Sequence, residues 1–214
     1  AIGHQALETF EASSDGDGNN TAVGINALQA ATTSINNTAV GAFASDVITT
    51  GSSNTSVGSS ALGTATTSTN NVAVGYRALS EMRANGNGNV AIGKDAIMGN
   101  ILDEDVDYMV GIGNACLVGA LESEASGTVA IGTSALAALT NGGGNLAIGY
   151  EAAKSLTIGD GNTIIGYQAG YALPAAQADA NTALGYYALG GANHVDADNN
   201  TMIGYRAGDS ITEG

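Results

Sequence analysis

Basic residues, cysteine and long apolar runs are the scarcest features of this 214-residue chain. Lysine and arginine number 5 against 20 acidic residues, so the formal net charge is -15. A surface of that sign repels a phosphate backbone, and we therefore expect no nucleic-acid partner. No run of 18 apolar residues occurs in the sequence, so we also expect no membrane insertion.

The remaining composition excludes two further classes of protein. Charged residues make up only 12% of the chain and hydrophobic residues 44%, which argues against intrinsic disorder. The 32 glycines show no three-residue period, which excludes a collagen helix. The single cysteine, Cys116, cannot form an internal disulfide and is expected to be a small buried hydrophobic residue.

A six-residue phrase, Ala/Ser-Ile/Val-Gly-x-x-Ala, recurs twelve times with spacings of 17 to 21 residues, eight times as written and four times with one or two substitutions. Its central glycines are Gly3, Gly24, Gly41, Gly58, Gly75, Gly93, Gly113, Gly132, Gly149, Gly166, Gly185 and Gly204. Such a short period indicates one supersecondary unit stacked on copies of itself. We treat residues 1–214 as a single repeat domain. The chain opens inside a repeat without an initiator methionine, which suggests a fragment of a longer fibrous protein.

The residues before each glycine predict a short β-strand. The residue directly before it is Ile or Val in eleven of the twelve units, and the residue three before it is Thr, Val or Leu. β-Branched residues at alternate positions suit one face of a pleated strand. The sequence therefore predicts an all-β, parallel β-solenoid of about twelve coils, each 17–21 residues long.

The other face of the predicted strands carries Ala or another small residue two before the glycine, in ten of the twelve units, and then the glycine itself. A line of small residues lets a second backbone approach closely, and if this line faced solvent, a long apolar strip would be exposed. We therefore favour association of several identical chains through this face, with threefold symmetry. The alternative is that the small residues pack against the return leg of their own coil. The return leg would begin with the Ala and Leu that lie three and four residues after the glycine.

Asparagine precedes most strands and marks a turn. In stacked coils these asparagines are expected to form a hydrogen-bonded ladder, as identical side chains do between stacked strands. The expected structural ladder comprises Asn20, Asn37, Asn54, Asn71, Asn89, Asn145, Asn162, Asn181 and Asn200.

The Asn-Thr-Ala-Ile/Val-Gly-x-x-Ala phrase resembles the head repeat of trimeric autotransporter adhesins. It is also similar to the Asn-Asn-Thr-Ala-Ile-Gly-Tyr-x-Ala-Gly repeats of bacteriophage tail fibres and large bacterial surface proteins, most closely at residues 162–170, 181–190 and 199–214. The resemblance implies a left-handed parallel β-roll that forms a homotrimer. Two features depart from it: the period is longer than that of the usual adhesin head coil, and the seventh unit, at Gly113, is irregular.

Acidic clusters in the longer gaps are candidate calcium ligands, because Asp-x-Asp spacing lets carboxylates converge on a hard cation. The candidates are Asp15, Asp17, Asp103, Asp105 and Asp107. Solvated loops are the commoner explanation for such acidic clusters. We expect no cofactor other than this calcium.

Tyrosines follow the glycine in the later repeats, at Tyr150, Tyr167, Tyr186 and Tyr205. A stacked column of rings is first a packing device. Exposed rings could instead form a glycan platform.

No catalytic constellation is present, so we expect no enzyme: Asp95 and Glu151, for example, lie several coils apart. The leading hypothesis is a structural and adhesive segment of a trimeric fibre, a rigid spacer with receptor or glycan contacts on its loops. Its location would be extracellular, on a phage tail fibre or a bacterial surface. The alternative is a single-chain β-solenoid that binds carbohydrate or ice. The threonine column at Thr21, Thr38 and Thr55 invites the ice-binding idea, but it breaks at Val72, which fits a buried column better.

Overall fold

The computed structural model describes residues 1–10, 18–82, 86–99, 106–173, 178–191 and 198–209. The chain divides into two compact units, residues 1–108 and 109–214. The strands of the first unit are β1 (Thr21–Val23), β2 (Thr38–Val40), β3 (Thr55–Val57), β4 (Val72–Val74) and β5 (Val90–Ile92). Those of the second unit are β6 (Val110–Ile112), β7 (Val129–Ile131), β8 (Leu146–Ile148), β9 (Thr163–Ile165), β10 (Thr182–Leu184) and β11 (Thr201–Ile203).

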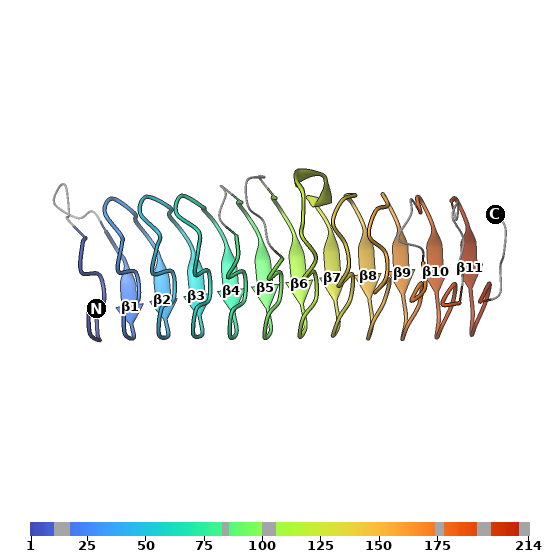
Figure 1. Cartoon of the computed structure of the whole chain (residues 1–214), viewed down its shortest axis with the longest axis horizontal. Coiled ribbons are helices and arrows are strands. Elements are labelled where there is room, and N and C mark those ends of the chain that lie inside the picture. The colour runs from blue at the N-terminus through green and yellow to red at the C-terminus, as the bar shows by residue number, and fades with distance from the viewer. Residues whose placement is uncertain (11–17, 83–85, 100–105, 174–177, 192–197, 210–214) are drawn as a thin grey trace. The chain divides into compact units, whose positions relative to one another are not determined.

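Successive strands within each unit pair in parallel and in register, as the side-by-side arrows in Figure 1 show. Thr21 lies opposite Thr38, for example, and Thr38 lies opposite Thr55. The first phrase joins β1 through a single parallel bridge between Ile2 and Val23. The prediction of an all-β, parallel β-solenoid is confirmed, with about nine turns of roughly 18 residues where the sequence predicted about twelve coils.

The central residue of each strand faces the interior of its own coil, and it is small in every strand except β9 and β11, which carry Ile164 and Met202 there. Ala39, Ala73, Ala91 and Ala130 have no exposed surface, and Ser56, at the same position, is buried and bonded to Ser45 Oγ at 2.8 Å. The prediction that the Ala/Gly face lies on the outside, where it would meet another chain, is therefore wrong. The alternative, packing against the return leg, describes the structure. Most coils hold a small residue on that face, and the coil of β9 accommodates the larger Ile164, which is buried there.

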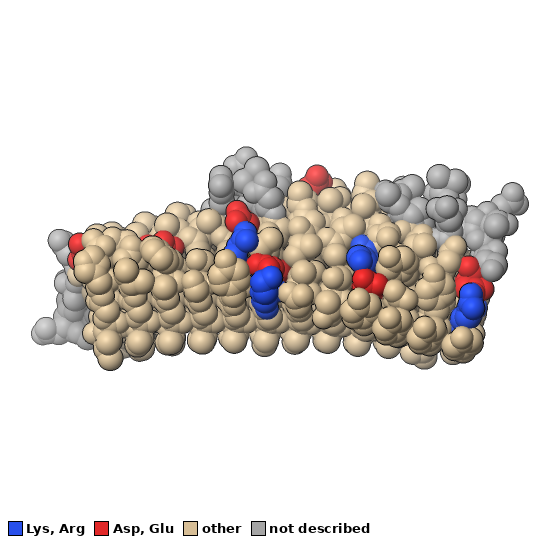
Figure 2. Space-filling view, turned by 60° about the horizontal axis from the view of Figure 1, so that its bottom comes forward, with Lys and Arg blue, Asp and Glu red and all other residues tan. Residues whose placement is uncertain are grey.

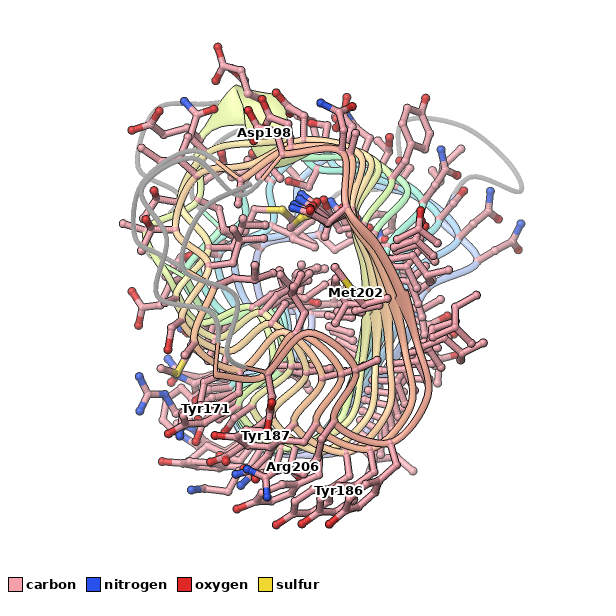
Figure 3. The ribbon with its side chains drawn as sticks, turned by 90° about the vertical axis from the view of Figure 1, so that its right-hand side faces the viewer. Tyr171, Tyr186, Tyr187, Asp198, Met202 and Arg206 are labelled. Carbon is pink, nitrogen blue, oxygen red and sulfur yellow. The ribbon has the colours of Figure 1, made fainter. Side chains whose placement is uncertain are left out.

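The interior is completed by the return leg of each coil. The alanines three residues after the glycine are fully buried from Ala27 to Ala188, and so are the leucines that follow them, including Leu62, Leu79 and Leu136. Cys116 takes the place of one of these alanines and is fully buried, as predicted. In Figure 3, Met202 of β11 points into the same interior.

Each coil turns its corner through residues with positive φ. At Ser60 and Leu62, two and four residues after Gly58, φ is 54° and 53°, values that cost a non-glycine residue roughly 1 kcal/mol. Hydrogen bonds to both neighbouring coils offset that cost: Ser60 N donates to Ala42 O at 2.9 Å, and Leu62 N donates to Ala78 O at 2.9 Å. The same pattern recurs in both units, so the repeat fixes the corner as well as the strand.

The only helical segment in the described ranges is the short 3-10 turn η1 (Ser123–Ala125). No helix there is long and apolar enough to cross a membrane.

Candidate functional site

The asparagines before the strands form a buried hydrogen-bonded column in the first unit. The backbone N–H of Asn37 donates to Asn20 Oδ1 at 2.9 Å, that of Asn54 to Asn37 Oδ1 at 2.9 Å, and that of Asn71 to Asn54 Oδ1 at 3.0 Å. Asn89 N continues the series to Asn71 Oδ1 at 2.8 Å. Each amide also donates across its own coil, as Asn54 Nδ2 does to Ser68 O at 2.8 Å. The column therefore ties each coil to its neighbour and to its own return leg.

A second column links Asn145, Asn162, Asn181 and Asn200 in the second unit, with N–H to Oδ1 distances of 3.0 Å at each step. One coil before Asn145, the equivalent position is Thr128. Its hydroxyl is buried and has no hydrogen-bond partner in the described structure. The asparagine column therefore lacks a member at Thr128, which the sequence analysis did not predict.

The outer face of each sheet is apolar and free of charge. Its two columns hold only Thr, Val, Leu and Ile in both units. In the first unit Val40 is 36% exposed, Val57 37% and Ile92 38%, and Thr38, Thr55 and Val72 beside them are partly exposed. The threonine column is therefore not buried, and the prediction of a buried column is wrong. This uncharged face of threonine and aliphatic side chains recurs along each unit.

The four predicted tyrosines form a stacked column on the corner after the strands. Ring centroids lie 5.1 Å apart between Tyr150 and Tyr167, 5.2 Å between Tyr167 and Tyr186, and 5.4 Å between Tyr186 and Tyr205, with interplanar angles of 13°, 4° and 15°. Each residue is 44% to 74% exposed, so the rings pack on one another and still meet solvent. Figure 3 shows Tyr186 at the outer corner of the coil.

Polar side chains flank this tyrosine column. The carboxylate of Glu151 accepts bonds from Lys154 Nζ at 2.6 Å and from Gln168 Nε2 at 2.7 Å, and these bonds lower the pKa of Glu151. Loss of water contact, together with the neighbouring Tyr150 and Tyr186, raises the pKa of Tyr167. A shallow hollow of about 240 Å³ lies beside Tyr186, Tyr187, Tyr205, Gln168 and Arg206, which is smaller than most ligand pockets.

Charged side chains on the surface in Figure 2 lie mostly in pairs of opposite sign. Lys94 Nζ is 3.1 Å from Asp95 Oδ2, and Arg206 Nε is 2.6 Å from Asp209 Oδ2. The described parts of the chain therefore offer no basic cluster for a polyanion.

Four of the five calcium candidates, Asp15, Asp17, Asp103 and Asp105, lie outside the described residues. The fifth, Asp107, accepts a bond from Asn87 N through Oδ1 at 2.6 Å. Within the described ranges no group of three or more His, Cys, Asp or Glu side chains could hold a metal ion.

Sequence reasoning missed a groove in the first unit, on the corners that follow β2, β3 and β4. Phe43, Ser60 and Tyr76 line it together with residues of the return legs. Its signal in the sequence is a short residue, Ser60, between two long ones, Phe43 and Arg77, at the same position of successive repeats.

Comparisons with protein-family models, with curated proteins and with solved structures find no match to this chain, so its assignment as a parallel β-solenoid rests on its own geometry.

Proposed function

We propose that this chain is a structural and adhesive segment of a homotrimeric fibre, carried by a phage tail or a bacterial surface. It acts as a rigid spacer and presents contacts to a cell-surface glycan or receptor on its corners and loops. The winding is left-handed, as in the adhesin heads and tail fibres that the repeat resembles.

The outer face of the sheet carries this proposal. Val40, Val57 and Ile92 present a recurring strip of exposed β-branched side chains with no charged residue among them. A contiguous apolar strip of this kind marks an interaction surface in a soluble protein. Each identical chain carries the same strip. If the chains associate around an axis parallel to the strip, the strip of every chain is buried to the same extent.

Self-association also suits an adhesive role. Three copies of each corner would be displayed around the axis, so that weak contacts to a repeating glycan add through multivalency. The interior of each coil, filled by alanine and leucine, leaves the corners free to vary without loss of the fold.

The test is the native mass of the purified chain by light scattering, first in calcium and then in chelator. We expect about three times 21.0 kDa in both conditions. A stable particle of 21.0 kDa would overturn the trimer and with it the role assigned to the outer face. A trimer lost only in chelator would point to cation binding by the acidic segments.

A second candidate is a single-chain carbohydrate-binding solenoid, which the exposure of the tyrosine column favours. Tyr186 and Tyr205 are 49% and 74% exposed and offer a stacked aromatic surface without any partner chain. A monomeric mass together with glycan binding at this column would make this candidate the better one.

A further inference from the structure

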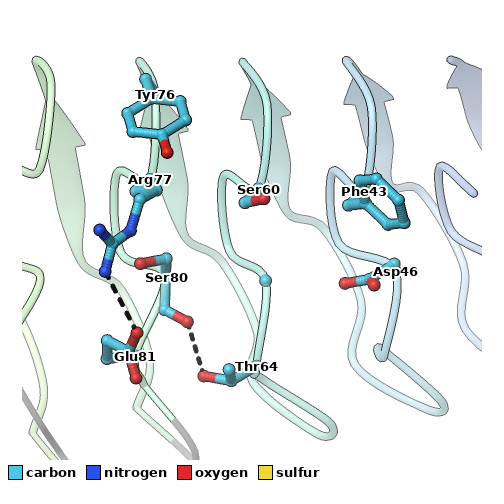
Figure 4. Close-up of a pocket in the computed structure, with 9 residues that line it drawn as sticks. Phe43, Asp46, Ser60, Thr64, Tyr76, Arg77, Ser80 and Glu81 are labelled. Atoms are coloured by element: carbon cyan, nitrogen blue, oxygen red, sulfur yellow. Dashed lines mark hydrogen bonds and ion pairs between the residues drawn. The ribbon is translucent and has the colours of Figure 1, made fainter. Parts of the chain in front are cut away.

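The first unit contains a groove of about 430 Å³, within the usual size range of small-molecule sites. Its wall is formed by three successive corners, and Figure 4 shows Ser60 between Phe43 on one side and Tyr76 with Arg77 on the other. Because neighbouring strands are about 4.8 Å apart, Phe43 and Tyr76 stand roughly 10 Å from each other along the stack. That gap exists because the middle coil carries short side chains.

The hollow follows from two columns of the repeat. At the second position after the glycine the sequence runs Phe43, Ser60, Arg77, and at the fifth position it runs Asp46, Gly63, Ser80. The middle coil thus has a serine and a glycine where its neighbours have larger groups. Phe43 is 41% exposed and Tyr76 50% exposed, so both present ring surface at the groove.

Polar groups converge on the same hollow. Ser80 lines it and is only 5% exposed, and its Oγ has no hydrogen-bond partner in the described structure. A buried hydroxyl without a partner is costly, and a small turn of the Ser80 side chain toward the groove would let a ligand satisfy it. Thr64 Oγ1 donates to Ser80 O at 2.8 Å, which holds this part of the wall in place.

Two carboxylates and one guanidinium complete the lining. Arg77 Nη2 lies 3.5 Å from Glu81 Oε1, so these charges largely offset each other. Asp46 is half-buried, and burial raises the pKa of its carboxyl group. The groove therefore carries a net charge of about -1, counting Asp46 and Glu81 against Arg77.

We propose that this groove is a saccharide-binding site for a neutral pyranose unit, with the apolar face of the sugar on Tyr76, the more exposed of the two rings, and its hydroxyls bonded to Ser80 and Asp46. Aromatic rings offer flat apolar surface, and a sugar hydroxyl can both donate to a carboxylate and accept from a serine. An anionic sugar would meet Asp46 and is disfavoured. This site deepens the adhesive part of the proposed function, but it belongs to one chain and does not require the trimer.

The groove also lies apart from the surface assigned to self-association. Its residues stand on the corners and return legs after the strands, whereas the assembly strip consists of the outward residues within the strands. One surface can therefore be occupied by partner chains while the other stays open to a ligand.

The experiment is saturation-transfer NMR on the full chain with separate methyl glycosides of glucose, galactose and N-acetylglucosamine, with methyl glucuronide as the anionic probe and glucosamine as the cationic one. We expect transfer to at least one neutral glycoside and none to the glucuronide. Two variants then locate the site: Tyr76→Ala removes a ring, and Ser60→Tyr fills the hollow. The second variant is tolerated by the backbone, because Tyr187 occupies the equivalent position with φ of 56° against 54° at Ser60.

Both variants should abolish the transfer, while Tyr167→Ala, which removes a ring from the tyrosine column of the second unit, should leave it unchanged. Circular dichroism and the native mass verify that each variant is folded and assembled. Absence of transfer to every neutral glycoside, its persistence in Tyr76→Ala or Ser60→Tyr, or a response to glucosamine alone would overturn the proposal. A correct trimeric mass combined with any of these results would remove the saccharide site and leave the fibre intact.

Discussion

Asn54 donates two hydrogen bonds to one oxygen atom, Oδ1 of Asn37, from its backbone N–H at 2.9 Å and from its Nδ2 at 3.0 Å. Both residues are buried, and the same arrangement is repeated one coil later between Asn71 and Asn54. Each asparagine is therefore acceptor for the coil that follows and donor to the coil before.

Removing one member of this column should destabilise the protein strongly. Asn54→Ala deprives Asn71 N of its acceptor and Ser68 O of a donor, and each buried group left unsatisfied costs about 1–3 kcal/mol. We expect a loss of about 3 kcal/mol in the free energy of unfolding, measured by denaturant titration. Thr66→Ala, at an exposed position of the same coil, is the control and should change it by less than about 0.5 kcal/mol. Equal effects of the two changes would contradict the role of the column.

Extending the asparagine column of the second unit by one coil should stabilise that unit. In Thr128→Asn, the new Oδ1 would take the place of a hydroxyl that has no partner and would accept from Asn145 N, as in the other coils. One added hydrogen bond is worth about 1 kcal/mol, so the melting temperature should rise by about 2–4 °C. Thr128→Val, which has the same shape without the hydroxyl, separates the gain of a bond from relief of the buried hydroxyl. A fall in melting temperature for Thr128→Asn would show that the position cannot take up the geometry of the column.

The central glycine is required both by its φ and by its neighbour. Gly58 has φ of 135°, and a Cβ there would meet the carbonyl oxygen of Gly75 in the next coil. Gly127 also has positive φ, at 73°, but a Cβ there would meet nothing within 4 Å. We expect thermal denaturation to show a loss of about 3 kcal/mol or more for Gly58→Ala and about 1 kcal/mol for Gly127→Ala. Similar losses of stability in the two variants would mean that backbone conformation alone explains the need for glycine at position 58.

A charge on the outer face of the sheet should break the assembly without unfolding the chain. Val57 is 37% exposed in the single chain, so Val57→Glu should change monomer stability little while reducing the mass seen by light scattering to that of one chain. Ala73→Glu, on the buried inner face of the next strand, should instead unfold the unit, because it places a charge in the apolar interior. An unchanged trimeric mass for Val57→Glu would contradict the assignment of this face.

Asp46 gives a pH dependence with a defined sign. Because burial raises the pKa of Asp46 above its ordinary value of 3.8, the folded state favours the protonated carboxyl. The contribution of this group to stability is full below 3.8 and is lost as the pH rises through the higher folded value. Asp46→Asn should therefore raise the melting temperature at pH 7, by about 2 °C at most for a half-buried group, and should have no effect near pH 3. A gain that grows as the pH falls would contradict the sign.

The strands and the asparagine column could be predicted from the sequence because each depends on one residue type at one position of the repeat. Thr38, Ala39 and Val40 show the alternation of a strand, and asparagine, as at Asn37 before them, is typical of turns. When the repeats stack in register, identical residues of neighbouring coils come into contact, even where the loops between them differ in length and sequence.

Which strand face points inward could not be decided by alternation. A period of two separates Ala39 from Thr38 and Val40 but assigns neither face to the core. Leucines of the return leg, such as Leu62 and Leu79, occupy much of the space inside the coil, so most coils place a small residue opposite them. The usual rule that bulky residues face inward fails for a coil this narrow.

The groove escaped prediction for a different reason. It depends on the difference in side-chain length between Phe43, Ser60 and Arg77, which are 17 residues apart in sequence and neighbours in space. Only once the register of the coils is known can such residues be compared as a column.

The asparagine column also gives the stack a polarity. Every step runs from N–H donors on one coil to an Oδ1 acceptor on the coil before it, so one side of a coil presents donors and the other an acceptor. Two coils can therefore join only head to tail, and two like sides brought together would oppose donor to donor or acceptor to acceptor. Aligned side-chain amides thus set a direction of growth, and a coil grafted into either unit in the reverse orientation would find no complement.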